Sequence, residues 1–158
     1  MDIHNINFRT IVSATESEDR VRSALSNFLF DNEIDVVNTE GHFGNRISIL
    51  QARLKGRKCI QFIELLNSNL PSNDLDRLKN ELEERMDDEC NLHIRLDKQA
   101  AFQGMVKLAA SSDTIDAQIK IKAYPARYEN AIAVAEKIFE NCGQIRHYRT
   151  KPLSCKDT

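Results

Sequence analysis

Short catalytic and nucleotide-binding motifs are missing from this chain, and their absence excludes several classes of enzyme. Its five glycines form neither GxGxxG nor GxxxxGK[ST], the loops that cradle nucleotide phosphates. GxSxG and HExxH, the commonest hydrolase signatures, are missing as well. We therefore expect a protein that is not an enzyme and that holds no cofactor.

Cysteine is sparse and scattered, which argues against disulfides and against zinc. The four cysteines, Cys59, Cys90, Cys142 and Cys155, include no CxxC pair, and a secreted disulfide scaffold with that count would be much shorter. The only close Cys/His pair is Cys90 with His93, and a strand would place the two on opposite faces. We expect reduced thiols, a cytoplasmic protein and no metal site.

Long apolar runs are also lacking. None approaches the roughly 18 to 20 residues of a membrane span, and the first eight residues lack a basic patch followed by an apolar stretch. A chain of 158 residues that is 41% hydrophobic is long enough for one well-packed core. We expect a single unprocessed α+β domain over residues 1–143, no membrane contact, and a polar, basic tail over 144–158.

The chain also lacks a net positive charge. The formal net charge is −2, so the chain is not a polyanion binder held by bulk charge. Residues 91–158 nevertheless carry 11 basic and 7 acidic side chains, against 11 and 17 in residues 1–90. Any basic surface should therefore be local and draw mainly on the C-terminal half.

The hydrophobic patterning indicates alternating strands and amphipathic helices. Period-two alternation predicts strands at 3–14, 34–38, 47–54 and 91–97, and a hairpin that joins 105–110 to 115–124. Three- and four-residue spacing predicts helices at 17–29, 56–70, 74–88 and 127–142, the last stopped by Gly143, with a short helix or turn at 98–104. No βαβ rhythm appears. The expected class is α+β, with a largely antiparallel mixed sheet and helices packed mainly on one face.

Two segments stand out as candidate binding elements. In EGHFGN, residues 40–45, His42 and Phe43 lie between glycines, where exposed rings could stack on unpaired bases. The alternative is a hairpin turn in which Phe43 folds back on the core. In RLDKQAAFQG, residues 95–104, basic and amide side chains could join lysines of the following hairpin in a phosphate-binding patch: Arg95, Lys98, Gln99, Lys107, Lys120 and Lys122. The alternative there is an ordinary solvated sheet face.

At these segments the sequence resembles a known family. EGHFGNRISIL (40–50), DDECNLHIRLDKQAAFQG (87–104) and KIKAYPAR (120–127) are similar, in order and spacing, to archaeal RNA-binding domain proteins described as predicted exosome subunits. The similarity spans about residues 5–142. It implies a fold like that of the ribosomal protein that binds five-S RNA, no established catalytic residues, and RNA association.

The chain departs from the family pattern at two positions. Arg46 stands where the family often has Pro, which would loosen the loop and add charge. Cys90 stands where it often has Gly, so the turn there either does not need positive φ or is slightly strained. Nothing transfers to the tail after Gly143.

These observations favour a non-catalytic RNA-binding protein of archaeal type, associated with the exosome or other RNA-processing proteins. Its expected contact residues combine the glycine-flanked loop, the later basic side chains and the end of the last block: His42, Phe43, Gly44, Asn45, Arg46, Arg95, Lys98, Gln99, Lys107, Lys120, Lys122 and Arg127. The reading requires the loop to lie beside the cations of the later strands.

Two alternatives come from other classes. In the first, the chain is an assembly subunit of an RNA-processing complex, and a narrow apolar stripe on a charged helix docks on a partner: Leu75, Leu78, Leu82 and Met86. In the second, Asp87, Asp88 and Asp97 hold Mg²⁺ in a nuclease site. The competing reading of these acids is a solvated acidic helix end.

Overall fold

In the computed structural model of the chain, residues 2–40 and 46–148 are described, and five strands within them form one antiparallel sheet. The strands are β1 (Ile3–Val12), β2 (Asp35–Glu40), β3 (Arg46–Lys55), β4 (Asn91–Asp97) and β5 (Thr114–Ile121). Their order across the sheet is β2-β3-β1-β5-β4, so β1 is central and β2 and β4 form the edges. The sheet is therefore wholly antiparallel over the described residues.

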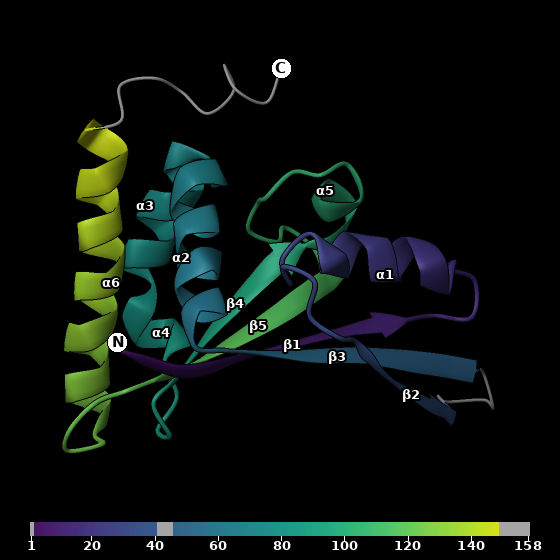
Figure 1. Cartoon of the computed structure of the whole chain (residues 1–158), viewed down its shortest axis with the longest axis horizontal. Helices are drawn as coiled ribbons and strands as arrows, with labels where there is room; N and C mark the ends of the chain where they lie inside the picture. Colours follow the sequence, from purple (N-terminus) through teal and green to yellow (C-terminus); the bar gives the residue numbers. More distant parts are fainter. Residues whose placement is uncertain (1, 41–45, 149–158) are drawn as a thin grey trace.

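The helices lie on one face of this sheet. They are α1 (Glu18–Ser26), α2 (Arg57–Asn69), α3 (Ser72–Asn80), α4 (Leu82–Arg85), α5 (Lys98–Phe102) and α6 (Tyr128–Tyr148). In Figure 1, α1 and α5 lie above the right-hand part of the sheet and α2, α3 and α4 above the left-hand part, while α6 stands beside them at the left and reaches below the level of the strands. The predicted α+β class with helices on one face is confirmed.

Three phenylalanines form the centre of the core between the two layers. The ring of Phe8 on β1 meets that of Phe62 on α2 edge-on, with centroids 4.9 Å apart. Phe28, which follows α1, stacks on Phe8 at 6.2 Å and meets Phe62 edge-on at 6.1 Å. Aromatic pairs in these geometries add about 0.5–1.5 kcal/mol beyond their buried area. They tie the two groups of helices to the central strand.

The segment 74–88 was predicted as one helix, and this is wrong in one respect. The helix is interrupted at Glu81 (φ −103°, ψ 12°), which separates α3 from α4. All four members of the predicted stripe are buried in the chain's own core, with exposed fractions of 6% or less: Leu75, Leu78, Leu82 and Met86. The stripe is therefore not available for docking on a partner, and only the near-neutral net charge is left to support the assembly-subunit reading.

The predicted hairpin between 105–110 and 115–124 does not form. Strand β5 pairs instead with β1 on one side and β4 on the other, which leaves it no free edge. The 105–110 segment runs outside β4, where Leu108 makes an isolated bridge to Leu96. Alternation alone cannot identify a strand's partner, because it reports which face is buried and not which edge is paired.

Two further details differ from expectation. Helix α6 does not stop at Gly143 but continues to Tyr148. Cys90 adopts φ 66° and its side chain is buried, so the strained alternative for this turn is the correct one. No helix in the described part of the chain is long and apolar enough to cross a bilayer.

Gly56, between β3 and α2, offers a clean test of backbone strain. Its φ of 62° and ψ of −135° belong to a region that side chains penalise, yet a Cβ there would touch nothing within 4 Å. We expect Gly56→Ala to lower the free energy of unfolding by about 1–3 kcal/mol through strain alone, as measured by urea denaturation. Gln61→Ala on the exposed side of α2 is the control, and equal effects of the two substitutions would contradict this account.

Candidate nucleic-acid interface

The face of the sheet opposite the helices is uncovered in the described part of the chain (Figure 1). Because successive strand residues point to opposite faces, the residues that alternate with the core project from it. The registers place them in transverse rows, each row crossing β3, β1, β5 and β4. We call this surface the open face.

The row near the start of β1 is basic. Lys55 on β3 and Lys120 on β5 lie on either side of Asn5 on β1. The Lys120 ammonium donates to the Glu89 carbonyl, a neutral partner, so its positive charge is not cancelled. Lys55 makes no ion pair with any other described residue. This row therefore offers two positive charges around an amide.

The next two rows are rich in amides and arginines. Arg53 donates from Nε to the Asn7 side-chain carbonyl at 2.7 Å, and Asn7 is opposite Gln118 on β5. In the following row, Arg9 and Arg95 are on either side of Asp116 on β5. Arg9 and Arg95 make no ion pair with another described residue. Guanidinium forks match phosphate geometry, and amides bond base edges or sugars.

The far end of the open face is apolar instead. Val37, Ile49 and Ile11 form the last row, and Val37 and Ile11 are 46% and 45% exposed. The open face thus grades from cationic at the start of β1 to apolar at its end.

Residues 122–127, which join β5 to α6, extend the basic end. In Figure 1 this loop drops below the sheet, on the open-face side. It carries exposed Lys122 and Arg127, and between them Tyr124, whose side chain is 99% exposed. An exposed aromatic ring beside cations is a stacking platform for unpaired bases. Tyr124 was missed by the sequence reasoning, although its position just before Pro125 at a strand end could have marked it.

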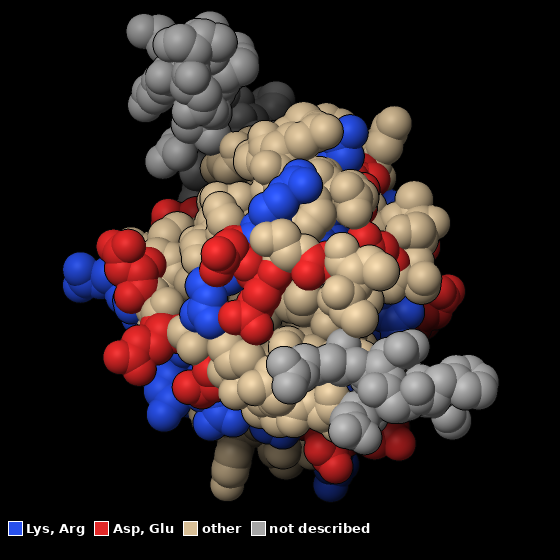
Figure 2. All heavy atoms as spheres, turned by 90° about the vertical axis from the view of Figure 1, so that its right-hand side faces the viewer, with Lys and Arg blue, Asp and Glu red and all other residues tan. Residues whose placement is uncertain are grey.

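Charge over the rest of the surface is mixed. Figure 2 shows the end of the molecule beside β2 and α1, where acidic and basic side chains alternate and no broad basic field appears. Lys and Arg side chains are also visible along the lower margin, the side of the uncovered face. This matches the net charge of −2. Bulk charge at this end of the molecule therefore offers a polyanion no broad basic surface.

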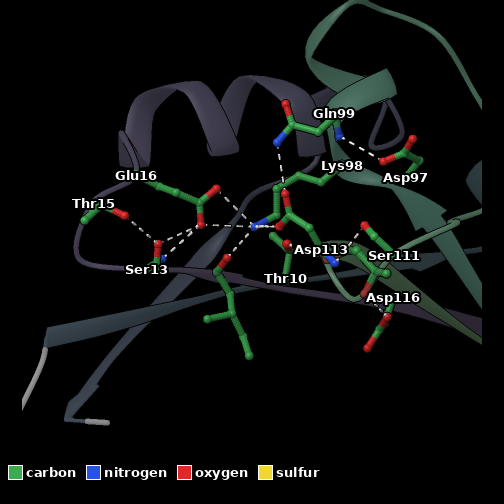
Figure 3. Close-up of polar contacts among 12 residues, drawn as sticks. Thr10, Ser13, Thr15, Glu16, Asp97, Lys98, Gln99, Ser111, Asp113 and Asp116 are labelled. Atoms are coloured by element: carbon green, nitrogen blue, oxygen red, sulfur yellow. Dashed lines mark hydrogen bonds and ion pairs between the residues drawn. The ribbon is translucent and has the colours of Figure 1, made fainter. Parts of the chain in front are cut away.

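Lys98 does not lie where it was predicted. It is 2% exposed, and its ammonium contacts the Ile11 carbonyl at 2.7 Å, Asp113 at 2.9 Å and Glu16 at 3.3 Å (Figure 3). Burial raises the pKa of Asp113, but hydrogen bonds from Lys98 and Gln99 outweigh it and leave the pKa lowered. Lys98 is thus a buried structural cation that joins three segments, out of reach of a phosphate.

Other predicted residues are separated from the open face. Gln99 on α5 is on the helix side and donates to Asp113 at 2.9 Å. Lys107 is exposed in the segment alongside β4, where its carbonyl accepts from the Asp97 N–H. Of the predicted set, the structure brings together on or beside the open face Arg95, Lys120, Lys122 and Arg127.

The glycine-flanked loop lies outside the described residues. This applies to the predicted contact residues His42, Phe43, Gly44 and Asn45, and to the side chain of Arg46. Its flanking pair, Glu40 and Arg46, is described and closes the β2–β3 ladder. That pair is nine positions from Lys55 along β3, about 30 Å at 3.3 Å per residue. The ladder thus ends at the opposite end of the sheet from the basic row, while the expected position of the loop itself concerns residues outside those described.

The acids of the predicted nuclease site are used structurally. Asp87 accepts from the N–H groups of Glu89 and Asn91 at 2.9 Å each and contacts His93 Nε2 at 2.8 Å. Asp97, at the other end of β4, caps α5 by accepting from the Gln99 N–H. The described residues contain no group of three His, Cys, Asp or Glu placed to hold a metal. The three acids therefore do not form one site there.

Comparison with known proteins adds independent information. A family model described as RNA binding matches residues 5–121. The RNA-binding protein PAB1135 of Pyrococcus abyssi is 36% identical over 148 residues, covering 89% of this chain and 96% of the relative. An uncharacterised protein of Methanocaldococcus jannaschii, MJ0213, is 31% identical over 77% of this chain and 87% of its own length.

Solved structures show the same fold. The DUF54 protein AF2318 of Archaeoglobus fulgidus superposes with a TM-score of 0.79 at 30% identity, over 86% of this chain and 99% of its own. Mth689 of Methanothermobacter thermautotrophicus, also a DUF54 protein, gives a TM-score of 0.76 at 35% identity, over 88% and 99%. These two relatives therefore share the fold of this chain.

The buried position of Lys98 predicts a large stability effect. Lys98→Met keeps the stem but leaves Glu16 and Asp113 facing each other without a cation, which should cost about 3 kcal/mol of unfolding free energy. Denaturant titration measures this, with Lys107→Met, at an exposed and unpaired lysine, expected to change stability by less than about 0.5 kcal/mol. A mild effect of Lys98→Met, equal to the control, would contradict the buried network.

The turn around Asp87 predicts a pH dependence. Burial raises the Asp87 pKa, but hydrogen bonds from His93, Asn91 and Glu89 outweigh it and lower the pKa from 3.8 to about 2. A depressed pKa means that the stabilisation is present above about pH 4 and is lost as the pH falls toward 2. We expect about 1 kcal/mol after solvent screening. Thermal melts of Asp87→Asn should lack this component, and parallel pH profiles for both proteins would refute the assignment.

Proposed function

This chain belongs to the RNA-binding family, and we propose that it binds single-stranded or irregular RNA on the open face of its sheet without catalysing a reaction. The observation that carries the proposal is the uncovered face itself. Its basic end presents unpaired cations, amides and a fully exposed tyrosine on one side of the molecule. The close relative PAB1135 is itself called an RNA-binding protein, which supports the same conclusion.

The chemistry of the face favours unpaired RNA over duplex RNA. Lysines and arginines would neutralise phosphates, while Asn5, Asn7 and Gln118 supply donors and acceptors for base edges and the 2′-hydroxyl. Tyr124 would stack on a splayed base at the margin. Duplex RNA hides its base edges, so these amides would have less to bond there.

We place this binding within RNA processing, at the exosome or a comparable machine. The support is the resemblance of the three sequence blocks to predicted exosome subunits. A non-catalytic role is consistent with the structural use of Asp87 and Asp97, whose carboxylates accept backbone N–H groups. The chain would then present RNA to catalytic partners.

The open face predicts how salt and mutation act together. Each phosphate contact contributes about −0.7 to the slope of log K against log salt for single strands. Arg9→Ala and Lys55→Ala, at unpaired and exposed positions, should each weaken binding of a labelled 12-nucleotide RNA several-fold and reduce the slope by about 0.7. Fluorescence anisotropy at several salt concentrations measures both quantities.

The matched control is Lys137→Ala, which removes an exposed cation from α6 on the helix side. Its affinity and salt slope should equal those of the unmodified chain. If Lys137→Ala weakens binding as much as Arg9→Ala, or if neither open-face substitution changes the slope, the RNA does not bind on this face.

A further inference from the structure

A cleft of about 550 Å³ opens at the β4 edge, beyond the rows of the open face. Its walls come from α3 and α4 on one side and from the segment after Leu108 on the other. The lining contains three arginines, one histidine, two acids and a small apolar surface: Arg77, Arg85, Arg95, His93, Glu84, Asp87, Met86, Ala109, Ala110 and Ser111. Pockets for small ligands typically fall in this range of volume.

The floor of the cleft is the part of edge strand β4 that lies between the two segments paired with its outer edge. Asp87 pairs with the Asn91 carbonyl at one end of β4, and the 107–109 segment pairs with Arg95 and Asp97 at the other. Because alternate strand residues direct their N–H and C=O groups to the same edge, those of His93 point outward as well. The isolated antiparallel bridge between Met86 and Leu92 turns the His93 N–H toward the Arg85 carbonyl, whereas neither covering segment bonds the His93 carbonyl. An acceptor is thus displayed between the two walls.

The arginines of the cleft differ in how firmly they are held. Arg85 donates two hydrogen bonds to Glu81, from Nε at 3.2 Å and from Nη2 at 2.7 Å, so its charge is largely balanced by that carboxylate. Arg77 contacts Glu81 only through Nε at 3.3 Å and is 47% exposed. Arg95 makes no ion pair with another described residue. Arg77 and Arg95 therefore have N–H groups to offer an anion.

The acids have different consequences for a ligand. Asp87 already accepts from its own turn and from His93. Glu84 is exposed and has no partner among the described residues, so it would repel an anion placed against it but would accept from an amino group. A ligand that fits is thus anionic at the arginines and carries a donor toward Glu84. The apolar Ala109 and Ala110 would border a flat ring.

We propose that this cleft binds one nucleotide of the RNA strand, with its phosphate at Arg77 and Arg95 and its base between the β4 edge and Glu84. The inference rests on the proposed function and deepens it, because His93 and Arg95 end the rows of the open face at this edge. A strand crossing the face would deliver a nucleotide here. Bases with an exocyclic amino group, such as cytosine, should be preferred over uracil, because the carboxylate accepts from that group.

An extended peptide is the competing ligand for any strand edge. Here the covering segments leave only the His93 carbonyl accessible at the edge, which is too little for a ladder. The guanidinium groups also match a phosphate rather than a peptide.

The test is a titration of the full chain with cytidine and uridine 5′-monophosphates, followed by NMR amide shifts. We expect saturable shifts at His93, Ala109 and Ala110, with cytidine monophosphate binding about fivefold more tightly than uridine monophosphate. Arg77→Ala should weaken both about tenfold, and Glu84→Gln should erase the preference. Lys79→Ala, at an exposed cation on the same helix, is the matched control. Ala110→Trp, at an exposed position, should block the cleft without altering its charge.

Each other outcome overturns the inference. Inorganic phosphate that binds as tightly as the nucleotides would reduce the cleft to an anion site. Equal effects of Arg77→Ala and Lys79→Ala, or shifts confined to the open face, would also refute nucleotide binding there. The proposed function is judged separately, because Arg9→Ala and Lys55→Ala should weaken RNA binding whether or not the cleft accepts a nucleotide.

Discussion

One-sided burial of the sheet is the constraint on which the rest of the structure depends. Every strand except the edge strand β2 gives one set of alternate residues to a core shared with the helices, and the opposite set must remain solvated. The Phe8, Phe28 and Phe62 cluster fixes which set is which. A one-residue slip would exchange the two sets, so the register that builds the core also determines the chemistry of the open face.

The same constraint divides the cations into two kinds. Lys98 starts α5 on the covered side, where Glu16, Asp113 and the Ile11 carbonyl surround its ammonium group. On the open face, Arg9 and Lys55 form no ion pair with a described residue, although Asp116 lies between Arg9 and Arg95. A buried paired lysine contributes to the fold, while an exposed unpaired one is available to a phosphate. Sequence position alone does not distinguish them.

Local sequence patterns predicted the helices and strands well, but they predicted poorly which strands pair with each other. The five strands, the helix start at Ser17 and the α+β class followed from periodicity and capping chemistry, whereas the cap at Asp97 was not predicted. The partner of β5 and the break at Glu81 did not, because both depend on tertiary packing. Of the cations that lie on or beside the open face, Arg95, Lys120, Lys122 and Arg127 were among the predicted contact residues, while Arg9, Arg53 and Lys55 were not, although alternation already placed Arg9 outward. A count of basic residues by segment drew attention away from them.

The proposed interface also explains how a chain with a net charge of −2 could bind a polyanion. Its acids are concentrated on the helices and turns, whereas the open face keeps amides and unpaired cations. The resulting attraction is short-ranged, because charge is screened over about 8 Å at physiological salt. Binding would therefore depend on contacts within the face and not on a field around the whole molecule.

Lysine acetylation footprinting in the presence of saturating single-stranded RNA tests this claim most directly, since one mass-spectrometric measurement reports on both faces. The account predicts slowed acetylation of Lys55, Lys120 and Lys122, with the rates at Lys79 and Lys137 unchanged. Protection of Lys79 and Lys137 with Lys55 still reacting at its free rate would contradict it.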